Sequence, residues 1–148
     1  MKIKKIYLLL SFLFLVPLVL SGCSNRVNTK VWSKSTARYL LLKRANKKFD
    51  EAYQNNKDKK NIKINNKIDL IKCKKTSNSK AYCKWKLITL ARRNKNGKTQ
   101  TAKIIGEAYS YFNKGIQKDW YISSTNGTAN SLYLLKKGKW VKQDMSGY

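Results

Sequence analysis

Residues 81–112 read AYCKWKLITLARRNKNGKTQTAKIIGEAYSYF, with the dipeptide Asn96-Gly97 at the middle of the stretch. Asn-Gly between two runs of alternating apolar and polar residues is the strongest short-range signal for a β-hairpin, because both residues tolerate the positive φ angles of a tight turn. The pattern therefore predicts one strand over 81–92 and a second over 101–112.

The same turn predicts which residues face each other. If the dipeptide alone forms the loop, Lys95 faces Lys98, and the two numbers of every facing pair add up to 193. On one face, large side chains then lie beside small ones and leave room for a helix: Trp85 with Ala108, Leu87 with Gly106, Thr89 with Ile104 and Ala91 with Ala102. The opposite face would carry the pairs Lys86–Glu107, Lys84–Tyr109, Tyr82–Tyr111 and Ile88–Ile105.

An amphipathic helix is predicted ahead of the hairpin, over residues 33–54. Ser33 or Ser35 can cap its first turn. Apolar residues recur every four positions and form one stripe: Ala37, Leu41, Ala45, Phe49 and Tyr53. A basic amphipathic helix lies either on a membrane surface or against a sheet, and we favour packing on the apolar face of the hairpin.

The remaining segments are predicted to be strands, over residues 62–72, 119–123, 131–135 and 140–142. The fold class is α+β, with one N-terminal helix packed on an antiparallel meander of about four to six strands. In the order of its elements this arrangement is similar in outline to cystatin-like and NTF2-like folds. That likeness implies an architecture and no function, since one fold serves many functions.

The N-terminal segment has the order of a secretory signal peptide, with a basic stub, a short apolar run and small residues before a cysteine. The run ends on Leu20-Ser21-Gly22-Cys23, which resembles the lipobox of bacterial lipoproteins. The resemblance implies that Cys23 carries a diacylglycerol on its sulfur and, after cleavage, an N-acyl chain such as palmitate. An uncleaved transmembrane anchor is the alternative, but the apolar run of about 15 residues is shorter than the roughly 20 that span a bilayer.

This resemblance sets the expected organisation of the chain. Residues 1–22 form the lipoprotein signal peptide, 23–32 the lipidated N-terminus and tether, and 33–148 a single basic α+β domain. Two or more acyl chains hold a protein stably on a membrane, so the domain is expected outside the cytoplasm. Serine rather than aspartate follows Cys23, which by the family's sorting rule implies the periplasmic side of the outer membrane in a Gram-negative cell. In a Gram-positive cell, the expected location is the outer face of the cell membrane.

Lipidation of Cys23 would leave two cysteines, Cys73 and Cys83. An even remainder in an oxidising compartment predicts a disulfide, here one that closes a nine-residue polar loop. A metal site at this pair is disfavoured, because the chain has no histidine and too few thiols for structural zinc. No metal or cofactor is expected apart from the covalent lipid.

The charge of the chain is extreme. It amounts to +26, and removal of the three lysines of the signal stub leaves +23 on the mature side chains. Such a chain is attracted to polyanions such as phospholipid headgroups, lipopolysaccharide, teichoic acids or nucleic acid. An AT-rich genome would give the same lysine excess without any selection for binding, and the sequence leaves both explanations open. Lysine also lacks the planar fork with which arginine reads bases and phosphates.

Catalysis has little support in this sequence. There is no histidine to act as a base near neutral pH, and no phosphate-binding glycine loop. A binding face is more plausible, because tyrosines and lysines would project together from the outer side of the hairpin: Tyr82, Lys84, Lys86, Tyr109 and Tyr111. Its alternative is an ordinary solvated strand face, where aromatic residues simply fit. The four tryptophans, Trp32, Trp85, Trp120 and Trp140, are expected to serve packing.

These features together favour a non-enzymatic lipoprotein of the cell envelope. Its basic domain would bind an envelope protein or an anionic envelope polymer, as a component or accessory of an envelope assembly. Three alternatives stay open: a conjugation- or secretion-associated lipoprotein that handles DNA, an exclusion or immunity lipoprotein directed at a phage or plasmid, and a surface adhesin.

Overall fold

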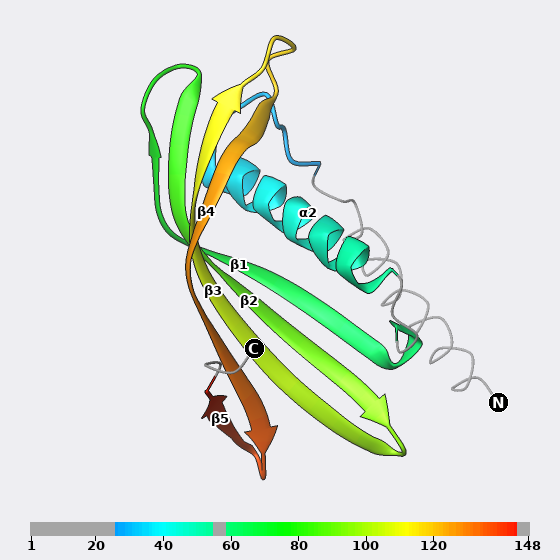
Figure 1. Cartoon of the computed structure of the whole chain (residues 1–148). Coiled ribbons are helices and arrows are strands. Elements are labelled where there is room, and N and C mark those ends of the chain that lie inside the picture. Colours follow the sequence, from blue (N-terminus) through cyan, green and yellow to red (C-terminus); the bar gives the residue numbers. More distant parts are fainter. Residues whose placement is uncertain (1–25, 55–58, 145–148) are drawn as a thin grey trace, which may run out of the picture.

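The computed structural model of the chain describes residues 26–54 and 59–144 (Figure 1). The predicted signal peptide, Cys23 and the first residues of the tether lie outside this part of the chain. The elements in chain order are α2 (Lys34–Tyr53), η1 (Lys59–Asn61), β1 (Ile62–Lys75), β2 (Lys80–Lys95), β3 (Lys98–Lys114), β4 (Trp120–Lys136) and β5 (Lys139–Gln143).

The five strands form one antiparallel sheet in the order β1-β2-β3-β4-β5, so every strand pairs with its neighbour in the chain. The sheet is strongly twisted, and α2 lies along one side of it, mainly against β1 (Figure 1). This arrangement confirms the α+β class and the helix packed on an antiparallel meander.

The central hairpin has the register that its turn predicts. Lys95 faces Lys98, and the pairing continues without a shift to Lys80 opposite Asn113. Asn96 and Gly97 have φ angles of 51° and 72°, the left-handed conformation that a two-residue type I′ turn requires. Both strands run several residues beyond the predicted bounds.

The helix begins where a capping serine was predicted. The Oγ atom of Ser33 accepts the backbone N–H of Thr36 at 3.0 Å, which satisfies one of the free donors of the first turn. Ala37, Leu41 and Ala45 of the predicted stripe are buried, whereas Phe49 is only half-buried. The stripe therefore packs on the sheet over the first three turns.

One correction concerns β4. Two short strands were expected over 119–123 and 131–135, but a single strand runs from Trp120 to Lys136. The polar residues between the expected strands resemble a loop in the sequence, yet they pair with β3 throughout. Two register shifts absorb one extra residue of β4 each, at Ser123 and Thr128. The polar side chains find partners there, since Thr125 Oγ1 lies 2.7 Å from Ser110 Oγ.

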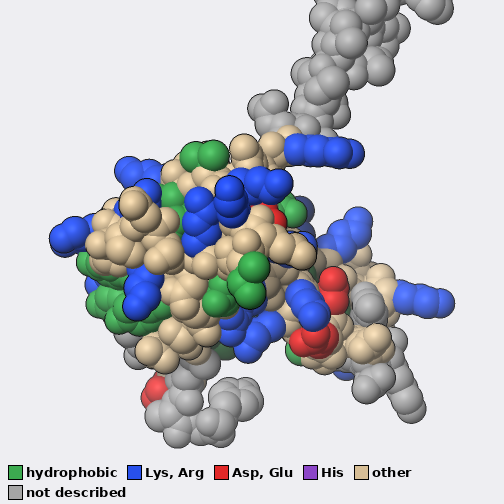
Figure 2. Space-filling model, turned by 90° about the horizontal axis from the view of Figure 1, so that it is seen from above, with side chains coloured by type: hydrophobic (Ala, Val, Ile, Leu, Met, Phe, Trp, Pro, Cys, Tyr) green, Lys and Arg blue, Asp and Glu red, His purple; other side chains and the backbone are tan. Residues whose placement is uncertain are grey.

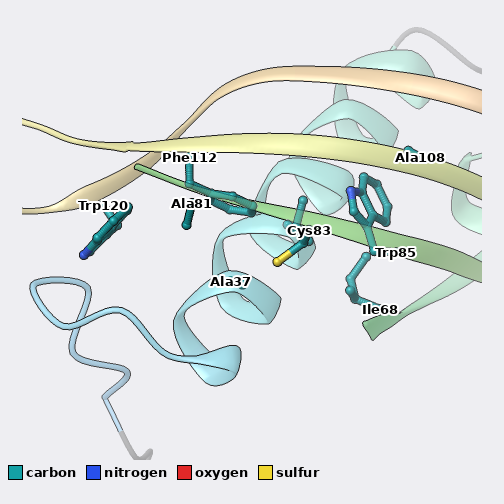
Figure 3. Packing of buried hydrophobic residues seen from close by; sticks show 9 residues of the cluster. Ala37, Ile68, Ala81, Cys83, Trp85, Ala108, Phe112 and Trp120 are labelled. Carbon is teal, nitrogen blue, oxygen red and sulfur yellow. The ribbon is translucent and has the colours of Figure 1, made fainter. Parts of the chain in front are cut away.

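The core lies between α2 and the sheet, towards the end of the sheet where β4 begins (Figure 3). Phe112 is fully buried, and the ring of Trp32 meets it edge-on with centroids 5.0 Å apart. Trp120 continues this cluster at 4.8 Å from Trp32. Trp85 is buried as well, and its Nε1–H donates a hydrogen bond of 2.9 Å to Ser110 Oγ. Three of the four tryptophans, Trp32, Trp85 and Trp120, thus pack in the core as predicted.

The predicted disulfide between Cys73 and Cys83 is present, and it joins β1 to β2 where the two residues are register partners. Cys83 belongs to the buried core, whereas Cys73 is half-buried beside it. The bond therefore links the edge strand β1 to β2 at a residue of the buried core.

We expect removal of this bond in the double variant Cys73→Ala/Cys83→Ala to lower the free energy of unfolding by about 3 kcal/mol. The reason is that a cross-link over ten residues restricts the unfolded chain. Urea unfolding of the two proteins measures the difference, and reduction of the wild-type protein should reproduce it. Equal stabilities, or two thiols that react freely with an alkylating reagent in the native protein, would contradict the prediction.

Candidate functional site

The five predicted binding residues lie together on the outer face of the sheet, which we define as the side turned away from α2. Tyr82 faces Tyr111 and Lys84 faces Tyr109 across the hairpin, so their side chains share this side. The rings of Tyr82 and Tyr111 lie 6.3 Å apart and are tilted by 34°. Tyr111 is half exposed, at 50%. The hairpin thus presents open aromatic surface on this face.

Glu107 lies between the two lysines of this group. One of its carboxylate oxygens is 3.1 Å from Lys86 Nζ, as the predicted pair requires, and the other is 3.9 Å from Lys84 Nζ. The ammonium group of Lys84 also lies 5.6 Å from the ring centre of Tyr109. Lys86 is therefore the closer partner of Glu107, while Lys84 makes a longer contact with the same carboxylate and a second contact with the ring of Tyr109.

The edge strand β1 adds lysines that the hairpin alone did not predict. Lys72 lies directly opposite Lys84, and Lys63 lies opposite Arg92. Like charges at directly opposite positions of a sheet repel each other and destabilise the pair. A bound anion would relieve this repulsion, so these pairs favour contact with negatively charged partners. A register shift between Leu70 and Lys72 places Lys72 on this side, and simple alternation does not reveal it.

A second lysine–aromatic group lies towards the other end of the outer face. Lys103 Nζ is 4.4 Å from the ring centre of Trp140 and 5.3 Å from that of Tyr133. Trp140 is 38% exposed, so its expected packing role is corrected: it covers a lysine on the surface. The sequence contained a signal for this group, because Lys136-Lys137-Gly138-Lys139 predicts a turn that brings β5 beside β4.

The outer face as a whole is strongly basic. Register partners place the following cations on it: Lys63, Lys67, Lys72, Lys74, Lys84, Lys86, Arg92, Lys103 and Lys142. Among the described strand residues, two carboxylates share this side, and each is engaged by a neighbour: Asp69 lies 3.2 Å from Lys67, and Glu107 lies between Lys84 and Lys86. Such a surface can bind extended anions through charge and ring contact.

A groove beside α2 is the alternative site. It has a volume of about 340 Å³ and lies between the helix and the sheet, lined among others by Phe49, Trp85, Leu87, Arg44 and Lys48. Its walls are mainly apolar, and its two cations would also favour an anionic ligand.

We next consider metal binding and membrane insertion by the described part of the chain. Within residues 26–54 and 59–144, no three histidine, cysteine, aspartate or glutamate side chains come together as metal ligands. None of the helices in this part of the chain is long and apolar enough to cross a bilayer.

No protein-family model, curated protein sequence or solved structure matches this chain significantly. The likeness of its element order to cystatin-like and NTF2-like folds therefore stays a prediction.

Proposed function

We propose that the protein is a non-enzymatic lipoprotein of the bacterial cell envelope, anchored to a membrane through lipid on Cys23. Its outer face binds an anionic envelope polymer or an acidic surface of an envelope protein, and the protein acts as a component or accessory of an envelope assembly. The observation that carries the proposal is the concentration of lysines and open aromatic rings on this face.

Electrostatics supports a polyanion as the partner. Each lysine near an anionic surface contributes about 1 kcal/mol to binding at moderate salt. The facing pair Lys72 and Lys84 adds to this contribution, because an anion bound between them would reduce a repulsion that exists in the free protein. The tyrosines next to these lysines add flat surfaces that suit sugar rings or bases.

Binding rather than catalysis also fits the engagement of the acidic side chains. Glu107 contacts two lysines, Asp69 contacts Lys67, and the carboxylate of Asp119 accepts a hydrogen bond from Thr29. A cation or a hydroxyl group thus engages each of these three carboxylates, and the contacts stabilise the sheet and its loops.

The test compares two double variants with the same change in net charge. Lys72→Gln/Lys84→Gln removes the facing lysines of the outer face and leaves Glu107 its contact with Lys86. Lys34→Gln/Lys43→Gln removes two exposed lysines of α2 that do not line the groove beside the helix. Binding of labelled lipopolysaccharide, teichoic acid, heparin and duplex DNA is measured by fluorescence anisotropy at rising salt concentrations.

We expect the first variant to bind the preferred polyanion up to about 30-fold more weakly at low salt, which corresponds to two lysines at about 1 kcal/mol each. The second variant should lose much less. Affinity that is unchanged between low and high salt would contradict polyanion binding. A clear preference for DNA or for heparin would favour the DNA-handling or the adhesin alternative, respectively.

A further inference from the structure

The end of the domain that lies next to the proposed anchor carries an apolar tip. The loop between β3 and β4, residues 115–119, places the side chain of Ile116 entirely in solvent, with a relative exposure of 104%. Val31, in the segment that leads from the anchor, is 59% exposed, and Tyr121 beside the loop is 48% exposed. Isolated exposed apolar side chains are common, so exposure alone does not indicate a contact site. The position of these side chains relative to the anchor is therefore the relevant observation.

Hydrogen bonds fix the segment from the anchor to this loop. The backbone N–H of Trp120 donates to the carbonyl oxygen of Thr29 at 2.9 Å, and Thr29 Oγ1 donates to Asp119 Oδ1 at 2.6 Å. Cys23 lies six residues before Thr29, and a fully extended chain of that length spans at most about 20 Å. A lipid on Cys23 would thus keep this end of the domain close to the bilayer surface.

The loop itself is held in a compact shape. The N–H of Gly115 donates to the carbonyl oxygen of Asp119 at 2.8 Å, and the N–H of Lys118 donates to that of Gly115 at 2.9 Å. The isoleucine is therefore presented outwards by a closed turn, and its insertion requires little additional ordering of the chain.

Lysines lie next to the apolar tip in the chain. Lys30 precedes Val31, Lys114 is the last residue of β3, and Lys118 lies within the loop. Figure 2 looks onto this end and shows many lysine and arginine side chains among small hydrophobic areas. Exposed apolar side chains and a tyrosine next to lysines suit the interface of an anionic bilayer, where the cations meet the headgroups and the apolar group enters the acyl boundary.

We propose that the tip formed by Ile116, Val31 and Tyr121 contacts the anionic lipid surface to which the protein is anchored. The sheet then stands end-on, with the Asn96-Gly97 turn at the opposite end of β3 and away from the bilayer. This orientation leaves the outer face open to partners beside the membrane. The inference rests on the proposed lipidation of Cys23.

Site-specific fluorescence tests this orientation. The acylated mature protein is reconstituted into vesicles of phosphatidylethanolamine and phosphatidylglycerol, after an environment-sensitive dye has been attached to a single introduced cysteine. Ile116→Cys probes the tip, and Lys98→Cys, an exposed position at the far turn, is the matched control. The disulfide and the lipid occupy the native cysteines, so the introduced thiol alone reacts.

We expect the dye at position 116 to shift its emission to shorter wavelengths and to lose intensity when nitroxide-labelled lipids are added. The dye at position 98 should show neither change. Protein that floats with the vesicles while the dye at 116 stays water-like would overturn the end-on contact and leave the anchor intact. Equal quenching at 116 and 98 would also overturn it. Protein that does not float with the vesicles would overturn the anchor and, with it, this inference.

Discussion

Replacing Cys23 with alanine is expected to abolish acylation and to leave the chain as a precursor that still carries residues 1–22. The sulfur of Cys23 is the attachment point that the lipobox resemblance implies, and alanine offers no nucleophile there. The apolar run of the retained signal segment would still associate with membranes, so fractionation alone is a poor measurement. Metabolic labelling with palmitate and the mobility of the protein on a denaturing gel distinguish precursor from mature lipoprotein.

The double variant Cys73→Ala/Cys83→Ala is the matched control for this experiment. It removes two thiols that the disulfide already occupies, so its palmitate label and its cleavage should equal those of the wild type. Palmitate that persists in the Cys23→Ala protein would contradict the lipobox assignment. A wild-type protein that keeps residues 1–22 would instead favour the uncleaved transmembrane anchor.

The parts of the fold that local chemistry determines could be predicted from the sequence. Asn96 and Gly97 both adopt positive φ, and a two-residue turn leaves one register for the strands on either side. The capping of α2 by Ser33 could also be predicted, because the cap and the N–H group that it accepts are only three residues apart. The disulfide between Cys73 and Cys83 could be predicted from the number of remaining thiols and from the expectation of an oxidising compartment.

The parts that depend on neighbouring strands could not be predicted in this way. The polar middle of β4 forms a strand because β3 offers it backbone partners and because Ser110 offers one to Thr125. Lys72 reaches the outer face through a register shift that only the pairing with β2 reveals. The contact of Lys103 with Trp140 needs three strands in place. The sequence therefore predicted the central part of the candidate face, on the hairpin of β2 and β3. It did not predict the parts of this face that depend on β1 and on β4 and β5.

Phe112→Ala is expected to lower the free energy of unfolding by roughly 3–5 kcal/mol, the usual cost of removing a fully buried phenylalanine ring. Phe112 has no exposed surface, and it lies where the segment before α2 meets β3 and β4. The loss includes its edge-on contact with Trp32, which contributes about 1 kcal/mol beyond the buried area. Urea unfolding followed by tryptophan fluorescence and by circular dichroism measures the change.

Tyr111→Ala is the matched control, since it removes an aromatic ring from the adjacent residue of the same strand. That ring is half exposed on the outer face, so its removal should cost no more than about 1 kcal/mol. The comparison distinguishes the two positions that an amphipathic α2 can take. If the helix and the segment before it lay on the membrane instead of on the sheet, Phe112 would lose its contact with Trp32, and the two variants would differ much less in stability. A large difference between them is therefore expected only if α2 and the segment before it cover this side of the sheet.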